Sequence, residues 1–182
     1  MDELNALNTA LSNYDDALNE EIASASNKED KVISFLKDFE NIAQTIITPA
    51  FEEALESIKR HGHEGRVSIR SFDEASYRRE KDKITAVNVT LLVFMKGIKK
   101  KRETEPHVFF NARSDAADSR QVNAIYNMFT SGELESGGHL SLGVQSQVSG
   151  GSYTLENITH EIAKNEAVKF LTMLFANAKV VK

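Results

Sequence analysis

The segment ITAVNVTLLVFM, residues 84–95, decides the fold class because apolar and polar side chains alternate along it. Its apolar content comes from Ile84, Val87, Val89, Leu91, Val93 and Met95. Asn88 and Thr90 fall on the opposite side, and a period of two is the pattern of a strand with one buried face. Leu92 and Phe94 make its second half apolar on both sides, so this end is predicted to be covered twice.

Shorter segments on either side of this strand favour the same structure. Val67 and Ile69 alternate with polar residues, and 108–110 is a compact apolar run. A polar stretch, 97–105, separates that run from the central strand and predicts a hairpin loop. Apolar residues alternate again over 140–148, between glycine-containing turns at 136–138 and 150–152. We therefore predict a mainly antiparallel sheet of about four strands.

Residues 114–131 fit two patterns. A helical face would hold Val122, Ile125, Tyr126 and Phe129, whereas a strand face would hold Val122, Ala124, Tyr126 and Met128. We predict a helix because Asp115 and Asp118 suit a helix start and the polar residues stay off the helical face. The chain should close with a helix from about Leu155, which has a kink or break near Asn165.

The N-terminal segment has helical periodicity. Its apolar side chains recur every three or four residues and form what we call the seam: Leu4, Leu7, Leu11, Tyr14, Leu18 and Ile22. About three heptads is the minimum for a coiled coil, and such a stripe needs a partner in water. We expect residues 1–26 to be an amphipathic helix for packing or oligomerisation, and residues 27–182 to be one α+β domain.

Two further signals predict how the helices after this segment begin and end. Ser26 and Glu29 match a capping box, which predicts that a second helix begins near residue 27. Thr48 followed by Pro49 predicts a third helix, or a kinked continuation of the second, with Thr48 as its N-cap. Gly62 should end that helix.

Charge is distributed unevenly along the chain. The net charge of −5 is the sum of −10 for residues 1–58, +7 for 59–113 and −2 for 114–182. The acidic front and the basic middle could attract each other within one chain or between two, and the basic middle could also face a polyanion. The candidate anion or nucleic-acid contacts are Arg78, Arg79, Lys99, Lys100, Lys101 and Arg102.

Composition excludes several kinds of site. The chain has no cysteine, so disulfides, thiolate metal sites and cysteine nucleophiles are excluded. The longest apolar run, Leu91–Met95, is far too short to span a bilayer. The start, Met1-Asp2-Glu3, lacks the features of a signal peptide. We therefore expect a cytoplasmic protein without membrane association.

Motifs for chemistry are weak. His61, His63 and Glu64 lack the helical spacing that makes H-E-x-x-H informative, so a polar loop is the better interpretation. Ser141 is not in a G-x-S-x-G elbow. The glycines at 150–152 could hold an anion before a predicted helix, but turn formation explains them better. The sequence predicts no catalytic, cofactor or metal residue and leans away from an enzyme, although residues could still converge in the folded chain.

The sequence thus favours a non-enzymatic protein-interaction module, adaptor or chaperone-like, that binds a protein partner or forms a homo-oligomer, most simply a homodimer, held partly by the seam. The alternative is nucleic-acid binding through the basic segment 78–102. An enzyme whose site forms only in three dimensions is the less expected third case. The expected order of elements is similar to that of small dimeric secretion chaperones. That similarity rests on order alone, and the basic middle departs from the acidic surface usual in such proteins.

Overall fold

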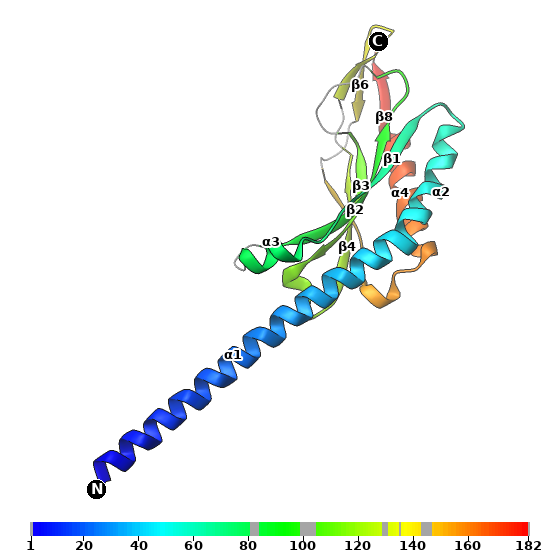
Figure 1. Ribbon diagram of the computed structural model, residues 1–182. Helices are drawn as coiled ribbons and strands as arrows, with labels where there is room; N and C mark the ends of the chain where they lie inside the picture. Colours follow the sequence, from blue (N-terminus) through cyan, green and yellow to red (C-terminus); the bar gives the residue numbers. More distant parts are fainter. Residues whose placement is uncertain are drawn as a thin grey trace.

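The computed structural model describes residues 2–80, 84–98, 105–128, 131–134, 136–142 and 147–181. The side chains at 2–4, 6–7, 131–133, 138–142 and 179–181 lie outside this description. The fold is α+β, as predicted: a long helix leads into an antiparallel sheet, and a helix follows near the C-terminus (Figure 1).

The helices are α1 (Asp2–Ile42), a π-helical turn (Ala43–Ile47), α2 (Thr48–Lys59), α3 (Glu74–Arg79) and α4 (His160–Asn177). Short 3-10 turns span Ser114–Ala116 and Leu155–Asn157. The strands are β1 (Glu64–Arg70), β2 (Ala86–Phe94), β3 (His107–Arg113), β4 (Gln121–Asn127), β5 (Ser131–Leu134), β6 (Gly138–Leu142), β7 (Val148–Thr154) and β8 (Ala178–Val181).

Two antiparallel sheets hold these strands. The larger has five strands in the order β1-β2-β3-β4-β7, and the smaller has three in the order β5-β6-β8. The main sheet thus has one strand more than the four predicted. The central segment is the predicted strand: β2 pairs with β1 on one side and β3 on the other, with Val89 opposite both Ile69 and Phe110.

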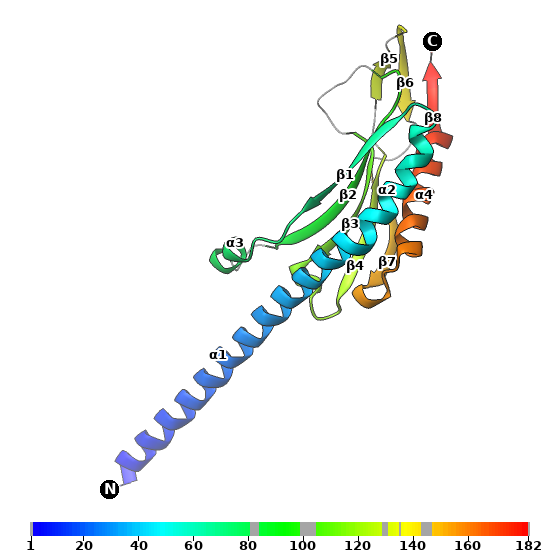
Figure 2. The same cartoon turned by 45° about the vertical axis from the view of Figure 1, so that its right-hand side comes forward.

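The core lies on one face of the five-stranded sheet. Along β2, Val87, Val89, Leu91 and Val93 are fully buried, and the residues between them are partly exposed. The helical run from α1 to α2 and helix α4 all lie over this buried face (Figure 2). They contribute Phe35, Leu36, Phe39, Phe51, Phe170 and Leu174, all fully buried. Burying each such side chain stabilises the fold by about 1.5–3 kcal/mol.

The predicted start of a second helix near residue 27 is wrong. Helix α1 continues without a break through Ser26 and Glu29, and the Glu29 side chain contacts Arg78 instead of closing a capping box. The alternative of a continuation across Pro49 is confirmed, although Thr48 does not act as a side-chain cap. A proline ring clashes with the carbonyl four residues earlier in an α-helix, and the π turn before Pro49 relieves that clash. Gly62, at a φ of 81°, follows the helix end as predicted.

The predicted helix over 114–131 is also wrong, and the strand alternative is correct. Beyond a 3-10 turn, β4 pairs with β3 and buries Val122, Ala124 and Tyr126, and Met128 is buried just after the strand ends; these four are the strand face named above. The predicted strand over 140–148 is two strands in different sheets. The turn predicted at 150–152 is wrong, because those residues lie inside β7.

The C-terminal helix begins later than expected. A 3-10 turn occupies Leu155–Asn157, and α4 starts at His160, where Thr159 accepts a hydrogen bond from the Ile162 amide as an N-cap. No break occurs near Asn165, since α4 is continuous. The charged stretch after Asp73 contains α3, which sequence patterns did not predict. Asp73 caps this helix by accepting from the Ser76 amide.

Candidate interaction surface

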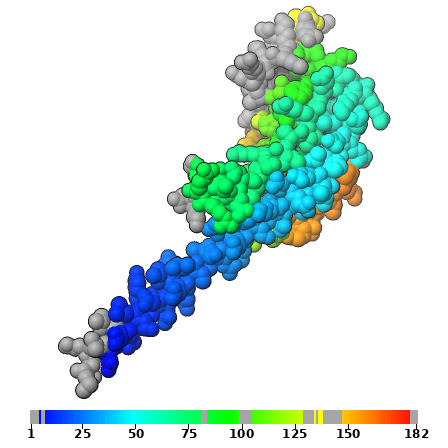
Figure 3. Space-filling model, in the orientation of Figure 1, coloured from blue at the N-terminus to red at the C-terminus, as the bar shows by residue number. Residues whose placement is uncertain are grey.

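The N-terminal half of α1 projects from the rest of the chain. Figure 3 shows it as an isolated rod, and every residue from Asn8 to Lys28 is exposed. The seam residues with described side chains are exposed to different degrees: Leu11 by 52%, Tyr14 by 65%, Leu18 by 40% and Ile22 by 59%. The side chains of Leu4 and Leu7 lie outside the described residues. The described part of the seam therefore makes no packing contact with its own domain.

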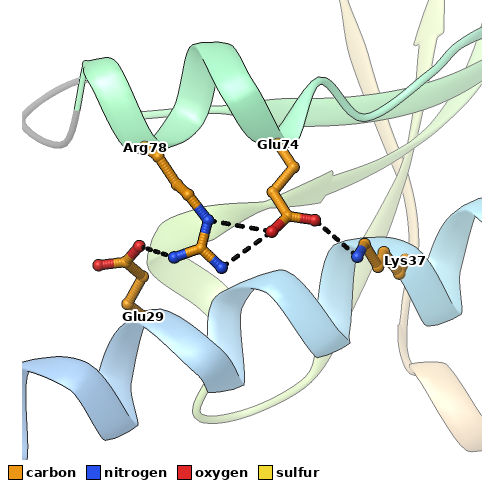
Figure 4. A network of polar contacts seen from close by, with 4 residues as sticks. All are labelled: Glu29, Lys37, Glu74 and Arg78. Atoms are coloured by element: carbon orange, nitrogen blue, oxygen red, sulfur yellow. Dashed lines mark hydrogen bonds and ion pairs between the residues drawn. The ribbon is translucent and has the colours of Figure 1, made fainter.

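The point where α1 leaves the domain is marked by a network of ion pairs with α3 (Figure 4). The Arg78 guanidinium lies 2.5 Å from a Glu29 oxygen and 2.8 Å from Glu74, which also pairs with Lys37 at 2.6 Å. Hydrogen bonds from Lys37 and Arg78 lower the pKa of Glu74. Exposed ion pairs such as these each contribute little to the stability of the fold. We infer that the network mainly fixes the direction in which α1 leaves the domain.

The seam shares a helix face with the buried stripe of α1. Leu18 is exposed and Leu36 is fully buried, and they are 18 residues apart. At 3.6 residues per turn, 18 residues make five whole turns, so both side chains point the same way. The face that packs on the sheet over the second half of α1 thus continues beyond the domain as the exposed seam.

The predicted nucleic-acid contacts are only partly described. Arg78 is engaged by Glu29 and Glu74, as above, and Arg79 donates to the Ala75 carbonyl and the Ser76 hydroxyl. Lys99, Lys100, Lys101 and Arg102 lie outside the described residues. The structure therefore does not bring these six residues together into a described site.

Of His61, His63 and Glu64, the last begins β1, and His63 makes contacts within the fold. His63 Nδ1 accepts a hydrogen bond from the Lys96 amide at 3.0 Å, and its ring packs against Phe175 at 4.7 Å between centroids. Burial, followed by the nearby charges of His61 and Lys96, lowers the pKa of His63. Within the described residues no three histidine or carboxylate side chains form a group that could hold a metal ion.

A buried polar cluster around Glu166 was not predicted from the sequence. One Glu166 oxygen accepts from the Tyr126 hydroxyl at 2.5 Å and from the Gly151 amide at 3.2 Å. The other accepts from the Tyr153 hydroxyl at 2.7 Å and from Lys169 Nζ at 3.0 Å. A carboxylate has about four acceptor positions, so this one is fully occupied.

Electrostatics agree with a structural role for this cluster. Burial raises the pKa of both Tyr126 and Tyr153 well above the usual range, and the hydrogen bond to Glu166 raises it further. Burial by itself acts to raise the pKa of Glu166, but the four donated hydrogen bonds outweigh it and leave that pKa below its ordinary value. The cluster borders an open cavity of about 570 Å³ between β7 and α4. The hydrogen bonds that this carboxylate accepts from Tyr126, Tyr153 and the Gly151 amide tie α4 to β4 and β7.

No protein-family model matches this chain, and comparisons with characterised proteins and with solved structures also give no match. Among the described helices, none has the length and apolar character needed to cross a membrane.

Proposed function

We propose that this chain is a non-enzymatic interaction module that self-associates, as a homodimer, through the N-terminal half of α1. The observation that carries the proposal is the exposed seam on a helix that projects beyond its domain. Large apolar side chains in a contiguous exposed stripe indicate an interaction surface. Each seam leucine or isoleucine covered by a partner would contribute about 1.5–3 kcal/mol.

Light scattering and sedimentation at micromolar concentration test this proposal. We expect the wild-type chain to be a dimer and the double variant Leu11→Glu, Leu18→Glu to be a monomer, because a buried unpaired carboxylate is costly. The matched control is Ser12→Glu, Asn19→Glu. It adds the same charge at exposed positions about 100–120° around the same helix from Leu18.

The control variant should remain a dimer. A wild-type chain that is strictly monomeric at these concentrations would refute self-association. If instead both double variants dissociate alike, added negative charge and not the seam would be responsible. Neither double variant should disturb the fold of the domain itself, because all four positions are exposed.

The nucleic-acid alternative stays a prediction. Arg78 and Arg79 make contacts within the chain, as described above, and this does not favour their use on a phosphate backbone.

A further inference from the structure

The face of the main sheet that points away from the helices has an apolar patch. Phe94 and Leu92 on β2 lie on this face, as do Phe109 on β3 and Ile125 on β4, and all four are partly exposed. Phe109 is directly opposite Ile125 in the ladder. We call this surface the open face. Its centre is defined by Leu92, Phe94, Phe109 and Ile125.

One border of the open face carries positive charge. On the edge strand β1, Arg66 and Arg70 point to this side with one acid, Glu64, beside them. The Arg66 guanidinium lies 5.9 Å from the centre of the Phe94 ring, which confirms that both occupy the same face.

The helix segment that carries the seam has the opposite charge. Residues 2–27 contain six Asp and Glu residues and no Lys or Arg. By helix geometry, Asp15 and Glu21 border the seam on its two sides, about 60° from Leu18. Pairing two such helices directly would bring together surfaces of like charge, whereas the open face supplies arginines.

Building on the proposed self-association, we propose that the seam of one copy docks on the open face of a second copy, and the reverse. The seam shares its helix face with the stripe that already packs on a sheet within each copy. A two-fold axis can therefore place the two sheets side by side in one layer, with one α1 above and the other below. Each α1 then covers its own sheet with its second half and the open face of the partner with its first half. The contact is closed and isologous.

The dimensions are compatible with this exchange. The 21 exposed residues from Asn8 to Lys28 span about 32 Å of helix at 1.5 Å per residue. Strands of seven to nine residues, such as β2 and β3, extend about 23–30 Å. The projecting half of α1 is thus long enough to cross the face that it would cover.

Complementation between two variants tests the arrangement. Leu18→Glu damages the seam and Phe109→Glu damages the open face, so each variant alone should be monomeric, with a dimer dissociation constant raised on the order of 100-fold. Mixed together, they keep one intact contact, the seam of one variant on the open face of the other. We expect mixing to restore a heterodimer that is weaker than the wild-type dimer.

A direct seam-to-seam pairing gives a different pattern. Phe109→Glu alone would then dimerise like the wild type, and mixing would restore nothing. That result would overturn the exchange and leave the proposed self-association intact. A monomeric wild type would overturn both. Tight binding of a single-stranded oligonucleotide at low salt, lost in Phe109→Glu, would assign the open face to nucleic acid and also overturn the exchange.

Cross-linking provides a second measurement that does not depend on a damaging variant. Because the chain has no cysteine, each single substitution to cysteine supplies one reactive position, and a cross-link between two such variants identifies one pair of positions. Tyr14→Cys on the seam and Thr90→Cys on the open face, treated together with a short bifunctional maleimide, should give a mixed dimer by mass. Tyr14→Cys treated alone should not cross-link, since the two seams lie on opposite sides of the sheet layer. Cross-linking of Tyr14→Cys to itself without a mixed product would refute the proposal.

Discussion

Replacing Glu166 with alanine should destabilise the fold strongly. The side chain is 1% exposed and accepts hydrogen bonds from Tyr126, Tyr153, Lys169 and the Gly151 amide. Truncation leaves the buried Tyr126 hydroxyl without its acceptor, and an unsatisfied buried donor costs about 1–3 kcal/mol. Losing the charge-assisted bonds from Tyr153 and Gly151 brings the total to about 3–5 kcal/mol. A chain of this size should lose roughly 2–4 °C in Tm for each kcal/mol.

Urea unfolding followed by circular dichroism measures this loss. The experiment is best done in the Leu11→Glu, Leu18→Glu background, so that association does not contribute to the measured stability. Glu161→Ala is the matched control because it removes an exposed carboxylate from the same helix, and it should cost less than about 1 kcal/mol. If Glu166→Ala costs no more than this control, the cluster does not hold α4 to the sheet.

The same variant should also change how stability depends on pH. The pKa of Glu166 is lowered in the folded chain, so its stabilising effect is complete above the unfolded value of 4.5. That effect is lost as the pH falls through the folded pKa. Between pH 7 and pH 3, Glu166→Ala should therefore lose less stability than the parent. An equal loss in both would contradict the assigned hydrogen bonds.

Two further substitutions test how the fold is packed. Gly65→Ala should lower the free energy of unfolding in urea by about 1–3 kcal/mol, because the added Cβ would lie 2.4 Å from Leu55 Cδ2 and 2.7 Å from the Leu92 carbonyl oxygen. The control Ser68→Ala, at an exposed position of the same strand, should be nearly neutral. Similar costs for the two substitutions would rule out the steric reason. His63 has a lowered pKa, so the fold should lose stability as the pH falls below about 6.5, where protonation removes the acceptor for the Lys96 amide. His63→Asn keeps an acceptor without titrating, so it should reduce that loss, and an unchanged pH profile would assign the loss to another group.

The central strands could be predicted because one period of two dominates them. In β2 the four valine and leucine positions of the buried face have no competing helical pattern. Residues 114–131 lack this clarity, since Val122 and Tyr126 belong to both possible faces. The choice was decided by pairing with β3, a contact between segments that local periodicity does not contain. Arg120, at a φ of 50°, makes the turn that starts β4, and nothing in its identity signals this conformation.

The Glu166 cluster could not be predicted for a related reason. Glu166 occupies a core position of α4, between the buried Ala163 and Phe170. On a periodicity argument, a carboxylate there looks like a shift of the apolar face, which suggested a kink near Asn165. Gly150 and Gly151, which lie beside it, suggested a turn because glycines are common in turns. An added Cβ at Gly150 would lie 2.6 Å from Glu166 Oε2, so glycine is required by the close approach of helix and strand.

The seam, in contrast, was visible in the sequence, and its direction follows from the fold. Forming the first turn is the costly step in making a helix, and elongation from an existing helix is much easier. The half of α1 that packs through Phe35, Leu36 and Phe39 supplies that existing helix. Extension toward the N-terminus then carries Leu18 onto the azimuth of Leu36, five turns away. The residues that pack the core therefore also fix the side of the molecule on which the seam is presented, and every copy presents it identically, as a closed two-fold contact requires.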